Sequence, residues 1–154
     1  MIITVVAVSK IREKYIQEGI NEYSKRLSSY CTLRIKEVDA QKVKPSMLIE
    51  KVKELEAQKI KQNISSDACV IALDEKGKQF NSYEFADFLL NSLINSGKSE
   101  ICFIIGGSNG LSSDIIKQAD YTCALSKLTF PHQLARLITL EQIYRGFRIN
   151  NNVV

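Results

Sequence analysis

The sequence is short of several residue types, and each shortage narrows the class of protein. It has no tryptophan, one histidine and two prolines among 154 residues. One histidine and four cysteines without CxxC spacing do not supply the ligands of a typical structural zinc site, so we expect no metal. No run of about 18 uncharged apolar residues is present, which excludes a typical membrane-spanning helix. The apolar N-terminus lacks the basic leader of a signal peptide and instead predicts a strand.

What is present describes an ordinary globular chain. Apolar residues make up 45% and charged residues 25% of the sequence, which excludes disorder, collagen and coiled coil. The length predicts a single domain over residues 1–154. Each cysteine lies in or next to an apolar stretch, where a free thiol behaves as a small hydrophobic group. We therefore expect a reduced protein located in the cytoplasm.

The net charge of +4 permits nucleic acid as a partner without requiring it. Basic residues are concentrated at both ends of the chain. Residues 1–66 carry 13 Lys or Arg against 8 Asp or Glu, and the stretch from Tyr121 onward carries 4 against 1. Solvated helix faces account for much of the excess in the first part.

Strand-like and helix-like segments alternate along the whole sequence. β-branched or apolar runs predict strands, and apolar residues at helical spacing predict the helices between them. This order favours an α/β fold with a mostly parallel sheet and helices on both faces. The expected strands span residues 2–8, 31–38, 68–73, 101–105 and 121–125, and the expected helices span residues 16–27, 45–62, 81–97, 113–119 and 131–148.

Local signals add detail to this pattern. The alternation of apolar and polar residues over 31–38 predicts a half-buried strand near an edge of the sheet. Pro45 is expected to open the second helix, and residues 75–78 (EKGK) have the composition of a turn. Asn81 and Glu84 resemble a capping box for the third helix, which Gly97 ends.

In such sheets, ligands bind at the carboxyl ends of the strands, which directs attention to the loops after Leu73, Ile105 and Leu125. The loop Gly106-Gly107-Ser108-Asn109-Gly110 lies between a strand and a helix, as a phosphate-binding loop does. Its spacing matches neither GxGxxG nor GxxxxGK[ST]. A tight turn that needs a positive φ explains the glycines equally well, so both interpretations stay open.

The C-terminal helix is apolar on nearly every side, which predicts burial, and a subunit interface is one way to achieve it. Glu141 and Arg145 have the spacing of an ion pair. Arg136 and Arg148 have no carboxylate nearby in the sequence, so we interpret them as phosphate contacts. His132, the only histidine, stands at the start of this helix, where the helix dipole and burial both favour the neutral imidazole.

Several motifs resemble the ribosomal RNA large subunit methyltransferase H family, a group of SPOUT methyltransferases. They span nearly the whole chain: residues 5–10 (VVAVSK), 22–27 (EYSKRL), 103–112 (FIIGGSNGLS), 126–133 (SKLTFPHQ) and 141–145 (EQIYR). The resemblance implies a homodimer that joins through the C-terminal helix and uses S-adenosylmethionine. It also implies methylation of N3 of a pseudouridine in helix 69 of 23S ribosomal RNA, on assembled ribosomes, and a C-terminal trefoil knot that periodicity does not predict.

The family pattern also assigns site residues. The positions that match its S-adenosylmethionine contacts are Leu73, Gly106, Leu125, Ser126, Lys127, Leu128, Thr129 and Phe130. We expect His132 to accept or orient a proton, Arg136 to stabilise the anionic base, and Arg145 and Arg148 to contact RNA phosphates. Family members end in a Tyr-His-basic tail, and no residue of the final stretch Asn150-Asn151-Asn152-Val153-Val154 matches it.

Two other functions are compatible with the same residues. One is a ribosome-binding or RNA-binding module without enzymatic activity, in which the basic helix docks on RNA and no donor binds. The other is a regulatory α/β domain that binds a nucleotide through the loop at residues 106–110. Binding of S-adenosylmethionine distinguishes an enzyme from the first alternative, and binding of a mononucleotide distinguishes the second alternative from an enzyme.

Overall fold

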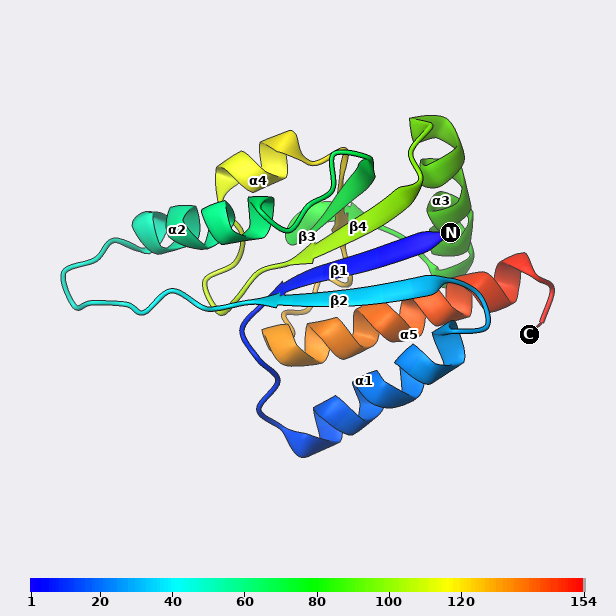
Figure 1. Cartoon of the computed structure of the whole chain (residues 1–154), viewed down its shortest axis with the longest axis horizontal. Coiled ribbons are helices and arrows are strands. Elements are labelled where there is room, and N and C mark those ends of the chain that lie inside the picture. The colour runs from blue at the N-terminus through cyan, green and yellow to red at the C-terminus, as the bar shows by residue number, and fades with distance from the viewer. Residues whose placement is uncertain (154) are drawn as a thin grey trace.

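The computed structural model describes residues 1–153, so Val154, the last residue of the expected domain, lies outside the described residues. Five strands and five helices alternate, as the sequence predicts (Figure 1). The elements are β1 (Ile2–Val8), α1 (Lys14–Leu27), β2 (Thr32–Val38), α2 (Ile49–Lys61), β3 (Ala68–Gln79), α3 (Ser82–Ser96), β4 (Glu100–Ile105), α4 (Ser113–Gln118), β5 (Tyr121–Ala124) and α5 (His132–Asn150).

The strands form one parallel sheet in the order β2-β1-β4-β3-β5, which confirms the expected architecture. β1 and β4 lie inside the sheet and are buried along almost their whole length, because their apolar residues meet a layer of helices on each face. β2, with its alternating apolar and polar residues, lies at one edge as expected. All carboxyl ends therefore point to the same edge of the sheet.

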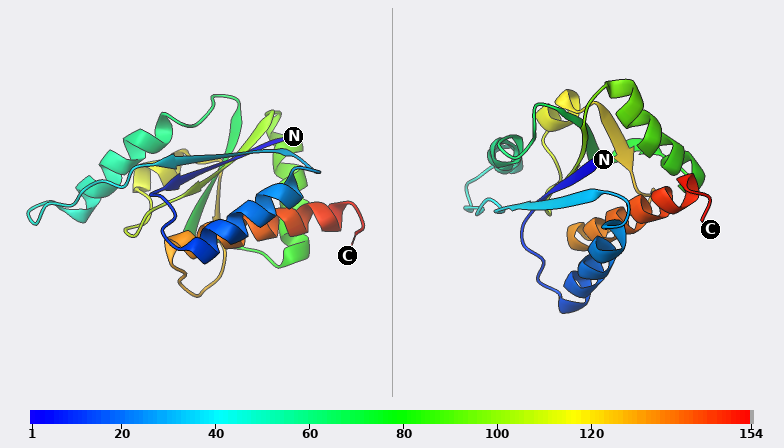
Figure 2. Two further views of the ribbon diagram at one scale, coloured as in Figure 1. Left: turned by 60° about the horizontal axis from the view of Figure 1, so that its bottom comes forward. Right: turned by 45° about the vertical axis from the view of Figure 1, so that its right-hand side comes forward.

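The helices form two layers around the sheet (Figure 2). α1, α3 and α5 contribute to one core cluster with β1, β3 and β4, and α2 and α4 pack into a second cluster on the other face. All four cysteines are free thiols, as the sequence predicts. Among residues 1–153, no helix is both long and apolar enough to cross a membrane.

Local signals place some helix ends well and others poorly. Asn81 and Glu84 form the expected capping box of α3, and Gly97 ends that helix in the left-handed region at φ +65°. The prediction that Pro45 opens the next helix is wrong, because α2 begins at Ile49. The segment before it exposes Val43 and Leu48, so it has no packed face that would extend the helix.

The prediction that the third strand ends near Asp74 is also wrong, because β3 continues to Gln79. Its register breaks in the middle: Cys123 of β5 is aligned with both Leu73 and Lys78. Residues 74–77 thus form a bulge in the β3–β5 pairing, and a Cβ at Gly77 would lie 2.7 Å from the backbone of Cys123. The glycine is required by this close approach, not by a turn as the sequence suggests.

α5 is buried mainly by its own chain. It lies between α1 and α3 (Figure 2), with Leu137 against Gly19 and Gly146 against Leu89. The inward side carries Leu140, Ile143 and Phe147. A second subunit is therefore needed only to bury the outer side of α5, because two helices of the same chain cover the rest.

Candidate functional site

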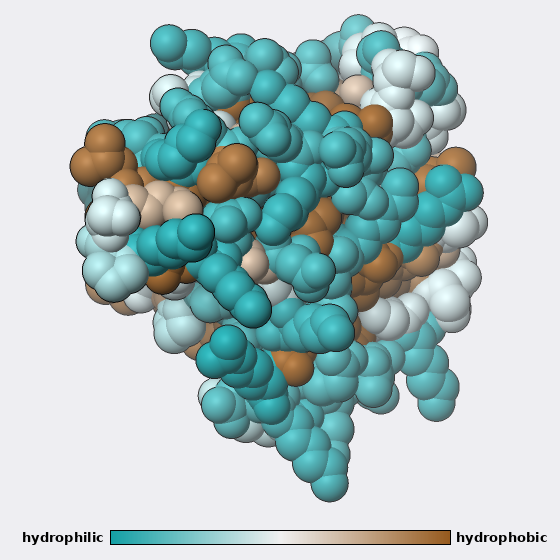
Figure 3. All heavy atoms as spheres, turned by 60° about the vertical axis from the view of Figure 1, so that its left-hand side comes forward, coloured by the Kyte–Doolittle hydropathy of each residue, from teal (hydrophilic) through white to brown (hydrophobic). Residues whose placement is uncertain are grey.

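A cavity of about 870 Å³ opens next to the middle of β3 and the carboxyl ends of β4 and β5. Residues 73–76 of β3 and the loops after β4 and β5 supply most of its walls, and α4, the start of α5 and the first turns of α2 complete them. Figure 3 shows this side of the molecule, where hydrophilic side chains predominate and apolar groups lie in patches between them. The edge that the strand order favours for a ligand therefore holds a large hollow.

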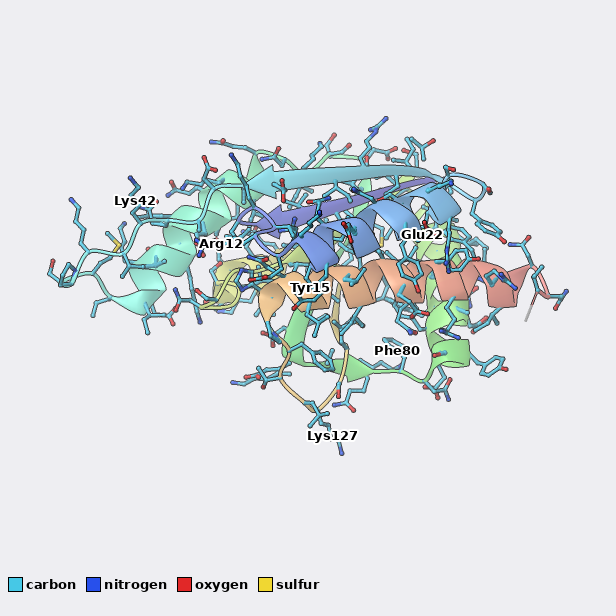
Figure 4. The ribbon with its side chains drawn as sticks, turned by 90° about the horizontal axis from the view of Figure 1, so that it is seen from below. Arg12, Tyr15, Glu22, Lys42, Phe80 and Lys127 are labelled. Atoms are coloured by element: carbon cyan, nitrogen blue, oxygen red, sulfur yellow. The ribbon has the colours of Figure 1, made fainter. Side chains whose placement is uncertain are left out.

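The structure brings together most of the residues expected to bind the cofactor. Those that line the cavity are Leu73, Gly106, Leu125, Ser126, Leu128, Thr129 and Phe130. Ser126 shapes its loop by accepting a hydrogen bond from the Leu128 amide at 3.0 Å. Lys127 is the expected position that does not line the cavity: it is exposed in the loop and points away from the body of the protein (Figure 4).

The glycine-rich loop at residues 106–110 is a tight turn. The Gly110 amide donates to the Gly107 carbonyl at 3.0 Å, and Gly110 has a φ of +80°. A Cβ at Gly106 would lie 2.7 Å from the Gly110 carbonyl carbon, so the loop folds back on itself. Ser112 caps the short helix that follows by accepting from the Ile115 amide. Of the two interpretations, the tight turn is the one that this geometry favours.

His132 is half-buried at the start of α5 and lines the cavity. Its Nε2 lies 3.0 Å from the Ser9 Oγ, at the end of β1. Burial lowers the pKa of His132 below its ordinary value of 6.5, and the positive charges of Arg136 and Arg12 lower it further. The imidazole is therefore neutral near pH 7 and able to accept a proton.

Arg136 differs from the expectation that it would contact an acceptor base. Its side chain is only 2% exposed, and its Nη1 donates to the Glu37 carboxylate at 2.5 Å. Its Nη2 donates to the carbonyls of Ser9 at 2.7 Å and Val8 at 3.5 Å. The partner carboxylate is 99 residues away in the sequence, which is why local spacing shows none.

The two arginines expected to contact RNA lie in the second half of α5. Arg145 forms the predicted ion pair with Glu141, one turn earlier. Arg148 donates to the Tyr144 hydroxyl at 3.0 Å and to the Val153 carbonyl at 3.1 Å. Both side chains keep part of their surface open to solvent, so their contact with RNA stays a prediction.

Sequence reasoning missed part of the cavity wall. Asp74, Glu75 and Lys76 line it because β3 continues past its expected end. Recognising this continuation in the sequence would have added these three residues to the candidates. Glu50 and Lys53 reach it from α2, a helix whose packing no local signal shows. Among the described residues 1–153, no group of three or more His, Cys, Asp or Glu could hold a metal ion.

The chain is similar to known proteins over nearly its whole length. A family model described as "Predicted SPOUT methyltransferase" matches residues 1–153. Proteins named ribosomal RNA large subunit methyltransferase H are 51% identical in Clostridium kluyveri, over 97% of this chain and 95% of the relative, and 50% identical in Exiguobacterium sp., over 99% and 97%.

Two solved structures share the fold at low sequence identity. A probable methyltransferase from Bordetella pertussis has a TM-score of 0.59 at 8% identity and covers 94% of this chain and 93% of its own. A probable methylase family protein from Haemophilus influenzae has a TM-score of 0.54 at 16% identity and covers 97% and 68%. With the family match and the close relatives, these findings show that the chain belongs to the SPOUT methyltransferases, in the ribosomal RNA large subunit methyltransferase H family.

Proposed function

We propose that this methyltransferase transfers a methyl group from S-adenosylmethionine to N3 of a pseudouridine in helix 69 of 23S ribosomal RNA. It acts on assembled ribosomes in the cytoplasm, as a single domain over residues 1–154 that forms a homodimer. The observation that carries the proposal is the meeting of the middle of β3 and the loops after β4 and β5 at one cavity, with seven of the eight expected cofactor positions in its walls. The names of the close relatives support the RNA substrate.

The cavity suits S-adenosylmethionine in size and chemistry. Its volume of about 870 Å³ lies within the range of small-molecule sites. Leu73, Leu125 and Leu128 offer apolar walls for an adenine ring, and the backbone at Gly106 and at residues 125–130 offers polar groups for the rest of the molecule. When bound, the donor supplies a methyl group already activated on a sulfonium, so the protein contributes mainly alignment.

His132 is the residue we propose to receive the acceptor's proton. N3 of the acceptor base carries a proton that has to leave before or during methylation, and it lies on the Watson–Crick edge, so the base must be unpaired. The neutral His132 imidazole lines the cavity and is held next to the donor positions of residues 125–130. A general base of this kind contributes roughly 10²–10⁴ in rate.

Arg145 and Arg148 are proposed to contact RNA phosphates. Replacing both with Gln should weaken ribosome binding and flatten its dependence on salt, by roughly 0.7–0.9 in the log–log slope per lost contact. Binding of the wild type and the double variant is compared between low and high salt. Lys61→Gln, on the other face of the sheet, is the matched control, because Lys61 pairs with Asp114 at 2.7 Å. An unchanged slope in the double variant would remove these residues from the RNA interface.

A trefoil knot and a homodimer complete the proposal. The match to the SPOUT methyltransferase family over residues 1–153 supports the knot. The outer side of α5, which α1 and α3 leave uncovered, supports the second subunit at this helix.

The deciding experiment is isothermal titration of the purified protein with S-adenosylmethionine and, separately, with ATP. The proposal expects about one donor bound per subunit and no ATP binding, followed by methyl transfer to ribosomes whose helix 69 carries the pseudouridine. Ribosome association without donor binding would favour a docking module instead. ATP binding without donor binding would favour a nucleotide-binding regulatory domain.

A further inference from the structure

We infer that Ser9 is a positioning residue for His132, and that the Arg136–Glu37 ion pair holds Ser9 in the conformation this requires. The inference rests on the proposed role of His132 as proton acceptor, but it concerns a set of contacts that can be tested without substrate. It gives a role to a set of polar and charged side chains next to the cavity that the proposed donor binding does not use.

Ser9 has an unusual backbone. It directly follows β1, and its φ of +70° lies in the left-handed region, which only Gly, Asn and Asp visit routinely. Its amide donates to the Val38 carbonyl of β2 at 2.8 Å, so the residue is fixed at the end of the β1–β2 ladder. A strained residue that persists at the edge of a site needs surrounding contacts that hold it there.

α5 supplies those contacts from two successive turns. Arg136 binds the Ser9 carbonyl at 2.7 Å, while His132, four residues earlier on the same helix, meets the Ser9 hydroxyl at 3.0 Å. The guanidinium is in turn fixed by Glu37 at 2.5 Å, from the end of β2 next to β1. One serine is thus held through its amide, its carbonyl and its hydroxyl by three different partners.

The contact at Nε2 matters because a neutral imidazole carries its proton on only one of its two nitrogens. A serine hydroxyl can either donate to Nε2 or accept from it, so the role of His132 decides the direction of this hydrogen bond. If Ser9 donated, the Nε2 lone pair would be occupied and Nδ1 would carry the proton, which leaves no free lone pair to receive another. We therefore assign the proton to Nε2, which donates to the Ser9 Oγ at 3.0 Å, and the accepting lone pair to Nδ1; the contact also fixes the plane of the ring. The charged groups that face His132 are Arg136 on α5 and Arg12 after β1, which oppose a positive charge, and Glu56 on α2, which favours one.

A purely structural role for Ser9 would be to close the turn after β1, and the variants separate the two roles. Ser9→Gly removes the hydroxyl and adopts a positive φ at no steric cost. Ser9→Ala removes the hydroxyl and keeps the strain. Ser24→Ala is the matched control, because the Ser24 hydroxyl binds only the Ile20 carbonyl within α1, at 2.7 Å.

The measurement is ¹⁵N nuclear magnetic resonance of the imidazole, which reports a single residue because the chain has one histidine. Wild type and Ser24→Ala should show one dominant neutral tautomer. Ser9→Gly and Ser9→Ala should both move toward the mixture of a free imidazole, and Glu37→Gln should shift the same way to a smaller extent. If Ser9→Gly keeps the wild-type tautomer, the hydroxyl has no positioning role; if only Glu37→Gln keeps it, the ion pair does not hold Ser9 in place.

Methyl transfer then provides a second readout. Ser9→Gly should lower kcat by about tenfold, within the contribution of a general base, and leave donor affinity unchanged. Its pH–rate profile should differ from that of the wild type on the acidic side. Failure of the proposed function would appear as absent methyl transfer in the wild type, which leaves the tautomer result untouched. A wild-type kcat and pH profile in Ser9→Gly would overturn the inference.

Discussion

Arg136 shows at the scale of one residue how costly a buried charge becomes once its partner is removed. Its guanidinium is almost fully buried and depends on Glu37, whose own side chain is 37% exposed. Breaking such a pair leaves an uncompensated charge in the interior, whereas two surface charges are screened by water. The arginine that sequence spacing assigned to the substrate is thus held by the protein, because its carboxylate partner comes from a distant strand.

We predict that Glu37→Gln destabilises the fold by about 2–3 kcal/mol, somewhat less than a fully buried pair because Glu37 is partly hydrated. The free energy of unfolding from urea titration measures the effect. Glu18→Gln is the control, since Glu18 pairs with Lys14 at the surface, 3.9 Å away, with side chains that are 66% and 90% exposed. Its change should stay within about 0.5 kcal/mol. Equal effects of the two substitutions would show that the buried pair stabilises the fold no more than the surface pair does.

At the scale of elements, β3 departs most from what its sequence suggests. Residues 75–78 have the composition of a turn, Glu-Lys-Gly-Lys, yet they belong to β3, which bulges here and then pairs with β5 again. Periodicity identifies an apolar run and the polar residues that end it, but the second part of this pairing depends on a strand that comes more than 40 residues later. By contrast, the caps of α3 were predicted correctly because Asn81, Glu84 and Gly97 act within their own helix.

Gly77 allows β3 to approach the backbone of β5 closely at this bulge. Gly77→Ala would place a Cβ 2.7 Å from the Cys123 backbone and 2.8 Å from the Thr122 carbonyl carbon, so one backbone has to move. We predict a loss of about 2–3 kcal/mol in unfolding free energy, with weaker donor binding because the displaced segment lines the cavity.

The comparison variant for Gly77 is Gly97→Ala. Gly97 has a positive φ, but a Cβ added there would meet nothing within 4 Å, so only backbone strain of about 1 kcal/mol is expected. Its donor affinity, measured by titration, should equal that of the wild type. If Gly77→Ala were as stable as Gly97→Ala and bound the donor normally, residues 74–77 would not be packed as tightly as the structure shows.

For the whole molecule, the sequence predicts the sheet, its parallel strands and the edge that holds the site. It does so because each strand carries its own pattern and because ligands in parallel sheets gather at one edge. The bulged pairing of β3 with β5 and the pairing of Arg136 with Glu37 are long-range contacts, and no local pattern specifies them. The left-handed backbone of Ser9 is likewise a product of tertiary contacts on a residue that rarely adopts it.

The pH dependence of stability tests the environment of His132 on the whole molecule. Its pKa is lowered on folding, so between that value and 6.5 the unfolded chain binds a proton that the folded chain does not. Stability should therefore fall as the pH drops below about 6.5, and His132→Gln should remove this part of the loss. Ser99 lowers the pKa of the Asp67 carboxyl, and Lys61 lowers that of Asp114. Protonation of these two carboxylates reduces stability below pH 4, and it does so equally in the wild type and in His132→Gln. A difference curve without slope between pH 7 and 5 would contradict the buried, neutral histidine.

The proposed second subunit also concerns the whole molecule, and α5 is where it can be tested. Leu134, Leu137 and Tyr144 pack against the core of their own chain, whereas Ile138 is half-buried outside that cluster in the described residues. An apolar side chain on the uncovered side of a helix is suited to a symmetric contact, in which the same surface meets itself. A charge placed there would be buried once from each subunit in the dimer, so two charges would lose water, whereas in the monomer the charge stays hydrated.

We therefore predict that Ile138→Asp yields the mass of a single chain in size-exclusion chromatography with light scattering, while the wild type yields twice that mass. Val43→Asp is the control, because Val43 is 60% exposed in the segment that leads to α2, on the other layer of the fold. Circular dichroism should show both variants folded. Methyl transfer, measured in both variants, tests whether the neighbouring subunit completes the site. A dimeric Ile138→Asp would place the interface elsewhere, and a monomeric variant with full activity would show that one chain completes the site alone.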